Sequence, residues 1–310
     1  MHRRNFLQQT ASLATAQAIA SAFFPLSTTA HAASSSTSDH PIAIFAKVFQ
    51  KHSFSQLADV VEKTNADGVE ATIRSGGHID PTASDYASQV GKMVSELAAR
   101  DKRLLIAATD INSVSKENRQ LLTVLKDNGV TYYRLGYYNY KPHVSPVDQV
   151  KQFADQAKAL ADLNGQLGIV GLYQNHAGKA NVGNLIWDLA ILLDGIPVSQ
   201  LGVALDLRHL RAEIGGSYET AVDAIRSHIA SVYLKDTKRT GSDGQSLQEV
   251  ALGHGMVSKA LFRDAIKSVA PAPLSVHVEY LGQKPHPPGD DAMVTQAYRD
   301  DVATLRSWMS

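Results

Sequence analysis

Groups that bind cations or move protons follow a short apolar run beyond the middle of the chain. The run is Leu-Gly-Val-Ala-Leu over residues 201–205, and it leads into Asp206, Leu207, Arg208 and His209. An apolar run of this length is typical of a parallel strand buried on both faces. Since side chains alternate along a strand, we expect Asp206 and Arg208 on one face and His209 one step beyond, in the loop. A carboxylate, a guanidinium and an imidazole in this arrangement can hold hydroxyl groups or transfer a proton.

The same kind of ending recurs at other apolar runs of the chain. In a parallel α/β fold the carboxyl ends of the strands meet at one edge, where loops vary while the sheet holds their ends rigid. We therefore expect these residues to form one site; the alternative is a set of ordinary structural polar groups. The strand ends supply Lys47, Glu70, Arg74, His78, Asp110, Asn112, Arg134, Tyr137, Gln174, His176, Lys235, His277 and Glu279.

Carboxylates and imidazoles in this set suggest a divalent metal. Glu279, Asp206, His277, His176 and His209 are hard or borderline ligands, which suit Mn²⁺, Mg²⁺ or Zn²⁺ better than a soft metal. Such an ion polarises a sugar carbonyl and stabilises an enediolate while a carboxylate or histidine moves the proton. For each single histidine, a hydrogen-bonded loop residue is the competing interpretation.

Lys235 follows a buried run and needs a partner. An ammonium inside a barrel is costly unless it is paired, and Asp206 or Glu279 is the expected partner. Two roles stay open for Lys235: an electrophile or general acid at a substrate oxygen, or a structural ion pair. Asp236 should point the other way and serve the structure. The tyrosines over residues 132–140 either stack on a sugar or pack in the core.

The elements that must position these groups alternate along the chain from residue 41. Strands are predicted at 41–49, 67–73, 103–110, 131–137, 168–173, 201–206, 231–234 and 274–280. Helices are predicted at 54–64, 83–100, 116–128, 147–163, 183–193, 218–227, 258–269 and 292–308. Eight such pairs predict an α/β fold, a single-domain (β/α)₈ TIM barrel. A doubly wound sheet is the main competitor, but no Gly-x-Gly-x-x-Gly follows the first strand.

Composition narrows the function classes. The chain has 310 residues, 44% of them hydrophobic, which favours one large domain with a substantial core. Its formal net charge is zero, so nucleic acid is not an expected partner. The absence of cysteine excludes disulfides, thiolate catalysis and thiolate metal sites.

The amino terminus predicts export. Arg3-Arg4-Asn5-Phe6-Leu7 precedes a mildly apolar segment, and Ala30-His31-Ala32 offers a cleavage site. We interpret residues 1–32 as a cleavable signal peptide of the twin-arginine type, with a membrane anchor as the alternative. Residues 33–40 are then a flexible linker and residues 41–310 the barrel. The mature protein is expected in the periplasm or outside the cell, with no membrane contact after cleavage.

The strand endings resemble those of the xylose isomerase-like TIM barrel superfamily, the sugar phosphate isomerases and epimerases, over essentially all of residues 41–308. The resemblance is carried by motifs at several strand ends, and the chain looks like an exported branch. These motifs are Asp67-Gly-Val-Glu-Ala-Thr-Ile-Arg-Ser-Gly-Gly-His78, Tyr173-Gln-Asn-His-Ala-Gly178, Asp206-Leu-Arg-His209, Lys235-Asp236 and His277-Val-Glu-Tyr280.

The resemblance also implies a set of metal ligands, from which this chain departs. Metal-dependent members place Glu, Asp, His and Glu at the ends of strands five to eight, and the matching residues here are Gln174, Asp206, Tyr233 and Glu279. Gln174 still offers an oxygen, but tyrosine is not a usual ligand for these metals. Either a histidine completes a weakened site of Gln174, Asp206 and Glu279, which we prefer, or Lys235 supplies the positive charge.

From these residues we expect a sugar isomerase or epimerase that abstracts a proton next to the carbonyl of a free or keto-sugar, assisted by Mn, Mg or Zn. The alternatives are a hydratase or lyase on a keto-sugar and a non-catalytic sugar-binding protein. DNA-repair members of the superfamily are disfavoured by the neutral charge. Which sugar is bound and the oligomeric state stay open. The predicted catalytic residues are Glu279, Lys235, His209 and His277, and the predicted substrate contacts are Glu70, Arg74, His78, Tyr137, His176 and Arg208.

Overall fold

The computed structural model describes residues 40–241, 244 and 246–310. The predicted signal peptide and residues 33–39 of the predicted linker lie outside this range. Among the described helices, none has both the length and the apolar character needed to cross a membrane.

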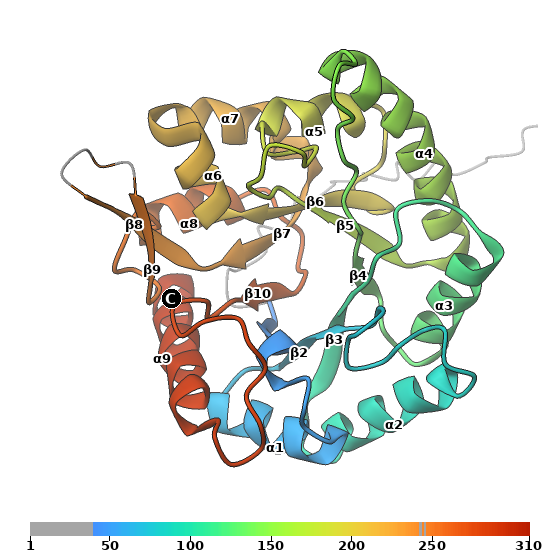
Figure 1. The fold of residues 1–310 in the computed structure, drawn as a ribbon, viewed down its shortest axis with the longest axis vertical. Helices are drawn as coiled ribbons and strands as arrows, with labels where there is room; N and C mark the ends of the chain where they lie inside the picture. The colour runs from blue at the N-terminus through green and yellow to red at the C-terminus, as the bar shows by residue number, and fades with distance from the viewer. Residues whose placement is uncertain (1–39, 242–243, 245) are drawn as a thin grey trace, which may run out of the picture. The chain divides into compact units, whose positions relative to one another are not determined.

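In the described part of the chain, eight parallel strands close into a barrel, in the order β1-β10-β7-β6-β5-β4-β3-β2 (Figure 1). The predicted TIM barrel is therefore confirmed. The strands are β1 (Ile42–Phe45), β2 (Gly68–Thr72), β3 (Arg103–Ala108), β4 (Tyr132–Arg134), β5 (Val170–Gln174), β6 (Leu201–Asp206), β7 (Ile229–Leu234) and β10 (Leu274–Val276).

Helices surround the barrel (Figure 1). Several begin at serine caps: Ser53 forms a capping box with Gln56, and Ser115 and Ser145 each accept a backbone N–H of the first turn. The helices are α1 (Phe54–Thr64), α2 (Tyr86–Ala98), α3 (Lys116–Asp127), α4 (Pro146–Leu167), α5 (Ile186–Leu192), α6 (Leu207–Ile214), α7 (Tyr218–Ile225), α8 (Lys259–Ile266) and α9 (Ala292–Met309).

The barrel interior changes from apolar to polar along the strands. A small buried cluster includes Leu172 of β5 and Ala204 of β6. Two residues further along the same strands lie Gln174 and Asp206, both buried. Because side chains two apart share a face, the apolar layer becomes a polar layer one step nearer the carboxyl ends.

Two elements were not predicted, and both border the carboxyl ends of the strands. β6 is followed directly by α6, so the expectation that Arg208 shares a strand face with Asp206 and that His209 lies in a loop is wrong. The Asp206 carboxylate caps this helix by accepting the His209 N–H at 3.1 Å, and one helical turn therefore carries His209 back over Asp206. The second element is an antiparallel hairpin of β8 (Asp236–Thr240) and β9 (Ser246–Val250) after β7.

Asp236 holds the turn that follows this hairpin. Its carboxylate accepts backbone N–H groups from Thr237, Gly253, Gly255 and Val257 at 2.8–3.0 Å. Gly255 lies so close that an added Cβ would come within 2.3 Å of the Thr237 carbonyl oxygen. Asp236 and the turn of residues 253–255 (Gly-His-Gly) thus have a structural role.

Asp301 ties α9 to the same turn. Its side chain is 2% exposed and accepts the Leu252 N–H at 3.1 Å. Burial raises the pKa of this carboxyl to about 7.

The pKa of Asp301 sets a pH dependence of stability. Between pH 4 and 7 the folded chain keeps a proton that the unfolded chain has released, so the free energy of unfolding falls as pH rises, by up to about 1.4 kcal/mol per pH unit for one proton. Asp301→Asn keeps an oxygen for the Leu252 N–H and does not ionise. We expect urea titrations to show a flatter pH profile for this variant and higher stability than wild type at pH 8.

Asp155→Asn is the matched control, since Asp155 is an exposed aspartate of α4 that does not act on Asp301. Equal pH slopes for wild type and Asp301→Asn would contradict the assignment.

Candidate active site

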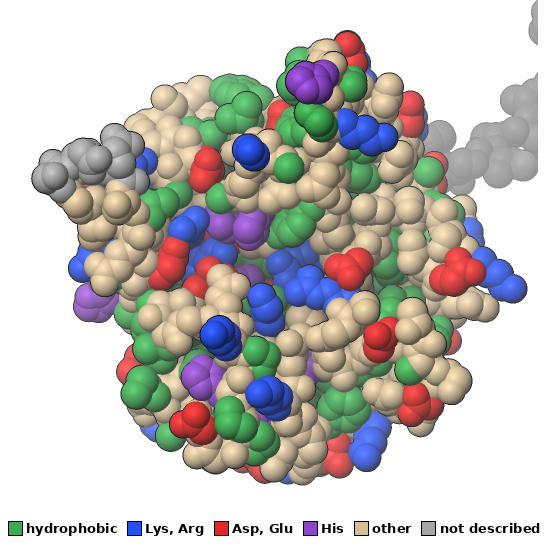
Figure 2. Space-filling model, viewed as in Figure 1, with side chains coloured by type: hydrophobic (Ala, Val, Ile, Leu, Met, Phe, Trp, Pro, Cys, Tyr) green, Lys and Arg blue, Asp and Glu red, His purple; other side chains and the backbone are tan. Residues whose placement is uncertain are grey.

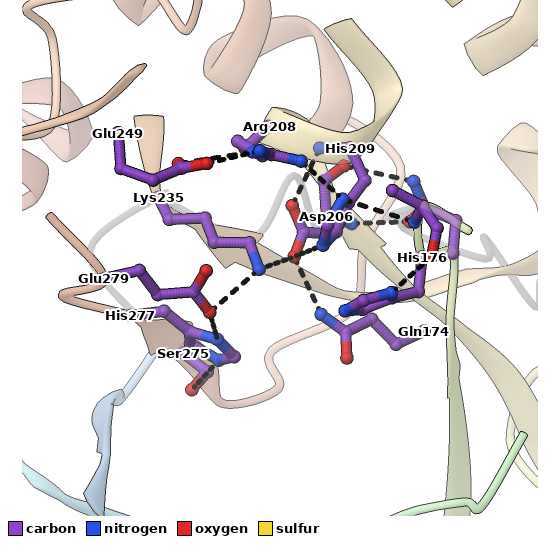
Figure 3. Close-up of polar contacts among 12 residues, drawn as sticks. Gln174, His176, Asp206, Arg208, His209, Lys235, Glu249, Ser275, His277 and Glu279 are labelled. Atoms are coloured by element: carbon purple, nitrogen blue, oxygen red, sulfur yellow. Dashed lines mark hydrogen bonds and ion pairs between the residues drawn. The ribbon is translucent and has the colours of Figure 1, made fainter. Parts of the chain in front are cut away.

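Charged and amide side chains form a closed series of contacts inside the carboxyl end of the barrel. We call this the interior ring: Glu70, Arg134, Gln174, Asp206, Lys235, Glu279 and His277. Figure 3 shows its members from Gln174 to His277. Its members come from β2, β4, β5 and β6, and from the residues just after β7 and β10. The topology places these strands side by side, so distant parts of the sequence meet in one layer.

The deep half of the interior ring pairs Glu70 with Arg134. Glu70 Oε1 lies 2.7 Å from Arg134 Nε, and Glu70 Oε2 accepts from Ser275 Oγ at 2.5 Å and lies 3.1 Å from His277 Nε2. Burial alone would raise the pKa of Glu70, but the Arg134 guanidinium and the bond to His277 lower it to about 2. This half carries a fixed ion pair with no exposed atoms at the carboxylate.

Gln174 joins the two halves of the interior ring. Its Oε1 accepts from Arg134 Nη1 at 2.5 Å and from the Tyr137 hydroxyl at 2.7 Å. Its Nε2 donates to Asp206 Oδ2 at 2.7 Å. One amide thus contacts a cation on one side and an anion on the other.

The outer half sets Lys235 between two carboxylates. Its ammonium lies 3.4 Å from Asp206 Oδ2 and 3.0 Å from Glu279 Oε1. Burial alone would lower the pKa of Lys235, but the two carboxylates outweigh it and raise that pKa. Burial alone would raise the pKa of Glu279, but the Lys235 ammonium outweighs it and lowers that pKa. Asp206 is fully buried, whereas the Glu279 side chain is 17% exposed. Glu279 is therefore the carboxylate of this pair that a ligand can reach.

Two histidines lie beside Asp206, with ring centroids 4.1 Å apart. His209 Nδ1 accepts from the Ala177 N–H at 3.3 Å and from Arg208 Nη1 at 3.1 Å, so the proton of the neutral ring sits on Nε2, 3.7 Å from Asp206 Oδ2. Burial lowers the pKa of His209 to about 2 and also lowers that of His176. Both imidazoles are neutral at pH 7. The partly exposed His176 can exchange hydrogen bonds with hydroxyl groups, whereas both ring nitrogens of the buried His209 face protein groups.

The rim of the barrel mouth is rich in cations. Figure 2 shows Lys and Arg side chains around a hollow at the centre of this face, with His and acidic side chains beside them. Arg208 pairs with Glu249 of β9, which ties the hairpin to the site. Arg74 Nη1 lies 3.7 Å from the exposed Asp110, and Lys47 Nζ donates to Gln283 at 3.2 Å.

A model of the xylose isomerase-like TIM barrel family matches residues 58–307. The chain belongs to this family. A search of curated protein sequences finds no match.

Solved structures of the same fold cover most of the chain at low sequence identity. A xylose isomerase-like protein from Mycobacterium smegmatis in complex with magnesium is 14% identical, with a TM-score of 0.65, over 89% of this chain and 99% of that one. D-psicose 3-epimerase from Clostridium cellulolyticum with D-tagatose is 11% identical, with a TM-score of 0.66, over 87% and 99%. A probable 3-DHS dehydratase from Bacillus anthracis is 12% identical, with a TM-score of 0.61, over 86% and 98%. At these identities the comparisons show the fold alone.

The structure brings most of the predicted site residues of this family member together at the carboxyl end of the barrel. Within or beside the interior ring lie Glu279, Lys235, Asp206, Gln174, His277, His209, His176, Arg208 and Tyr137. Arg74 lies at the rim.

Two predicted substrate contacts are placed differently. Glu70 is completely buried, and its oxygens contact Arg134, Ser275 and His277 beneath the mouth. His78 bonds Thr72 Oγ1 through Nδ1 at 2.8 Å, while its Nε2 is buried without a hydrogen-bond partner among the described residues. Glu70 is thus closed to a ligand, whereas His78 is partly exposed but turns both ring nitrogens toward the protein.

Sequence reasoning placed Arg134 among the strand-end residues without a specific role, and it did not single out Ser275 or Glu249. The sequence did hold a clue to Arg134. It lies two residues after Tyr132 in a predicted strand, so it shares that residue's inward face, and a buried guanidinium there needs an acidic partner. Ser275 lies two residues before His277 on the same strand face, which places it beside Glu70. Glu249 carried no signal, because the hairpin that contains it was not predicted.

The residues at the expected metal position do not fit a divalent ion. Among the described residues, no group of three or more His, Cys, Asp or Glu side chains is arranged to hold one. Gln174 Oε1 is committed to two donors, and the Lys235 ammonium stands between Asp206 and Glu279. A divalent ion about 4 Å from an ammonium is repelled by about 8 kcal/mol at an effective dielectric constant of about 20.

A hollow of about 500 Å³ lies elsewhere, between residues that begin or precede strands, among them Pro41, Arg103, Tyr132 and Pro273. It is therefore at the amino end of the barrel, where this fold does not carry its chemistry. We place the candidate active site at the opposite end, at the interior ring.

The deep ion pair gives a stability prediction. Glu70→Gln leaves the Arg134 guanidinium buried without its anion, so we expect the free energy of unfolding in urea titrations to fall by about 3–5 kcal/mol. Glu70→Gln/Arg134→Met, which removes both charges, should recover part of that loss.

Asp110→Asn is the control, since it breaks the exposed pair with Arg74 and should cost about 1 kcal/mol or less. If Glu70→Gln also lost only about 1 kcal/mol, the interior ring would not depend on the Glu70–Arg134 ion pair.

Proposed function

We propose that the protein is an isomerase- or epimerase-type enzyme that moves a proton next to the carbonyl of a free or keto-sugar. The observation that carries the proposal is Glu279, a partly exposed carboxylate 3.0 Å from the buried Lys235 ammonium at the barrel mouth. A base and a cation this close can act on adjacent atoms of one substrate. The fold of D-psicose 3-epimerase, solved with D-tagatose, supports a carbohydrate as the ligand.

In this mechanism Glu279 takes the proton from the carbon next to the carbonyl. The electron pair of the broken C–H bond moves to the carbonyl oxygen, which becomes an enolate oxyanion. Lys235 stabilises that oxyanion, because two of its three N–H groups face Asp206 and Glu279 and the third has no partner among the described residues. In isomerisation the hydroxyl proton of the first carbon passes to the enolate oxygen, the first carbon becomes the new carbonyl, and the protonated Glu279 returns its proton to the former carbonyl carbon. In epimerisation a water on the opposite face of the first carbon delivers a proton there, and Glu279 releases its own proton to solvent.

The surrounding groups suit this task. Because Lys235 lowers the pKa of Glu279, that side chain is a carboxylate at neutral pH, as a base must be. Asp206 is held by Gln174, His209 and Lys235, so it keeps the ammonium in place and does not reach the substrate. Arg208 and the neutral His176, both partly exposed, are positioned to hold hydroxyl groups, and His209 supports Arg208 from below. A divalent metal has no step in this mechanism.

A dehydratase would use the same first step, and the fold of the probable 3-DHS dehydratase supports it as the second candidate. The enolate would then re-form the carbonyl and expel the hydroxyl group of the next carbon, which leaves as water with the proton that Glu279 has taken up. The product would be one water lighter, which separates the two reactions by mass.

The test is hydrogen exchange in D₂O, followed by NMR on a panel of ketoses and keto-sugars. We expect the wild type to incorporate deuterium at the carbon next to the carbonyl of its substrate. Glu279→Gln removes the base and should slow this exchange by about 100-fold or more. Glu62→Gln, an exposed change on α1, serves as the control and should exchange like wild type.

A product of unchanged mass supports the isomerase or epimerase, and loss of water supports the dehydratase. Saturable sugar binding with no exchange in any panel member would point to a non-catalytic binding protein instead.

We also propose that the chain is exported through its paired arginines. Replacing Arg3 and Arg4 together by lysine keeps the charge but removes the motif. We expect the mature form to disappear from the periplasmic fraction on immunoblots while the precursor accumulates in the cytoplasm. Unchanged export of the double variant would contradict the twin-arginine assignment and leave a general secretory signal.

A further inference from the structure

We infer that the Lys235 ammonium replaces the divalent metal ion that metal-dependent members of the family hold, so that this enzyme carries its cation covalently. The catalytic part of the inference rests on the proposed function. The structural part, that Lys235 fills a former metal position, is tested without turnover.

The first support is the position of the ammonium. Asp206 and Glu279 are the two carboxylates retained from the expected ligand set, and Lys235 Nζ lies within 3.4 Å of one oxygen of each (Figure 3). The Lys235 side chain is 3% exposed, and these distances are too short for a water molecule between the ammonium and either carboxylate. A cation that both carboxylates share is already present.

The second support is the orientation of Gln174. Its N–H group, a donor, faces Asp206 Oδ2, where a metal site needs a lone pair. Turning the amide over would set its oxygen against that carboxylate and its NH₂ against Arg134 Nη1, so both contacts would become repulsive. The network therefore fixes Gln174 in an orientation that offers no ligand.

The third support is Tyr233, which stands at the expected histidine position. Its hydroxyl is buried and has no hydrogen-bond partner among the described residues, and its ring lies 5.1 Å from that of His277. Lys235 follows two residues later on the same face of the chain, one layer nearer the mouth. The segment that would have supplied a neutral ligand supplies a cation instead.

The exchange also conserves charge. Two glutamates and an aspartate around a divalent ion carry a net charge of minus one. Here Gln174 removes one negative charge and Lys235 in place of a divalent ion removes one positive charge, so Asp206, Glu279 and Lys235 again sum to minus one. The loss of one negative charge at Gln174 therefore offsets the smaller positive charge of Lys235. This is expected if the ammonium replaced the metal ion while the net charge at the mouth stayed the same.

The experiment reverses the replacement. In Gln174→Glu/Lys235→Ala the resident cation is gone, and a new carboxylate faces Asp206 Oδ2, so three carboxylates require a cation. We expect chelator-treated wild type to show only weak Mn²⁺ binding by the electron paramagnetic resonance signal of free Mn²⁺. The double variant should bind one Mn²⁺ per chain at least about 100-fold more tightly.

Adding Glu279→Gln to the double variant is the matched control and should remove most of the gain. Tight binding of Mn²⁺ by wild type, or equally weak binding by wild type and the double variant, would overturn the inference. Circular dichroism and thermal unfolding check that each variant is folded.

A second measurement tests the inference if the double variant does not fold. Wild-type exchange in D₂O should stay within twofold after dialysis against a chelator, while Lys235→Met should lose about 100-fold or more. Exchange abolished by the chelator and restored by Mn²⁺ would overturn the inference. If no protein exchanges any sugar, the proposed function fails, and the Mn²⁺ titration of wild type still decides whether a metal is held.

Discussion

The balance of buried charge inside the barrel is the constraint on which the rest of the site depends. Each of the two buried cations, Arg134 and Lys235, lies against a carboxylate that burial alone would protonate. Neither charge is tolerable without the other, because a lone buried ion costs several kcal/mol. The interior ring is therefore a single unit, in which each pair fixes the charge state of the next.

The fold supports this unit from outside. Asp206 caps α6, which positions His209, and Arg208 of the same helix pairs with Glu249 of the hairpin. Asp236 holds the turn after that hairpin through four backbone N–H groups. These contacts leave a rigid floor of charged groups from which Glu279 reaches the mouth. Preorganised charges of this kind are effective in catalysis because they need not rearrange when charge develops.

The sequence predicted the barrel because its signals are local. Apolar runs and the regular alternation of strand and helix each depend on neighbouring residues only. It did not predict α6, because Asp206 is both the last residue of β6 and the cap of the helix. No loop separates the two elements, so nothing in the sequence marks where the helix begins. The hairpin was missed for a related reason: β8 and β9 are polar and largely unburied, so they lack the apolar pattern of a strand.

The site was less predictable, since polar contacts across the barrel depend on register. Alternation along each strand indicated which residues face inward, and so the meeting of Asp206, Lys235 and Glu279 was foreseeable. Which partner each group takes was not. Glu70 was expected to contact substrate, yet Arg134 and Ser275 enclose it, and their heights relative to Glu70 are set by the stagger of β2, β4 and β10.

Gln174 shows how one residue type decides the chemistry of such a ring. An amide accepts on one side and donates on the other, so it can join the Arg134 cation to the Asp206 anion. A glutamate at the same place would satisfy Arg134 but repel Asp206, unless a further cation entered between them. The neutral amide thus allows a single ammonium to balance the two remaining carboxylates. Family membership fixes the barrel and the location of its mouth, whereas the donor and acceptor pattern of a few interior side chains determines whether the cation there is a metal ion or a lysine.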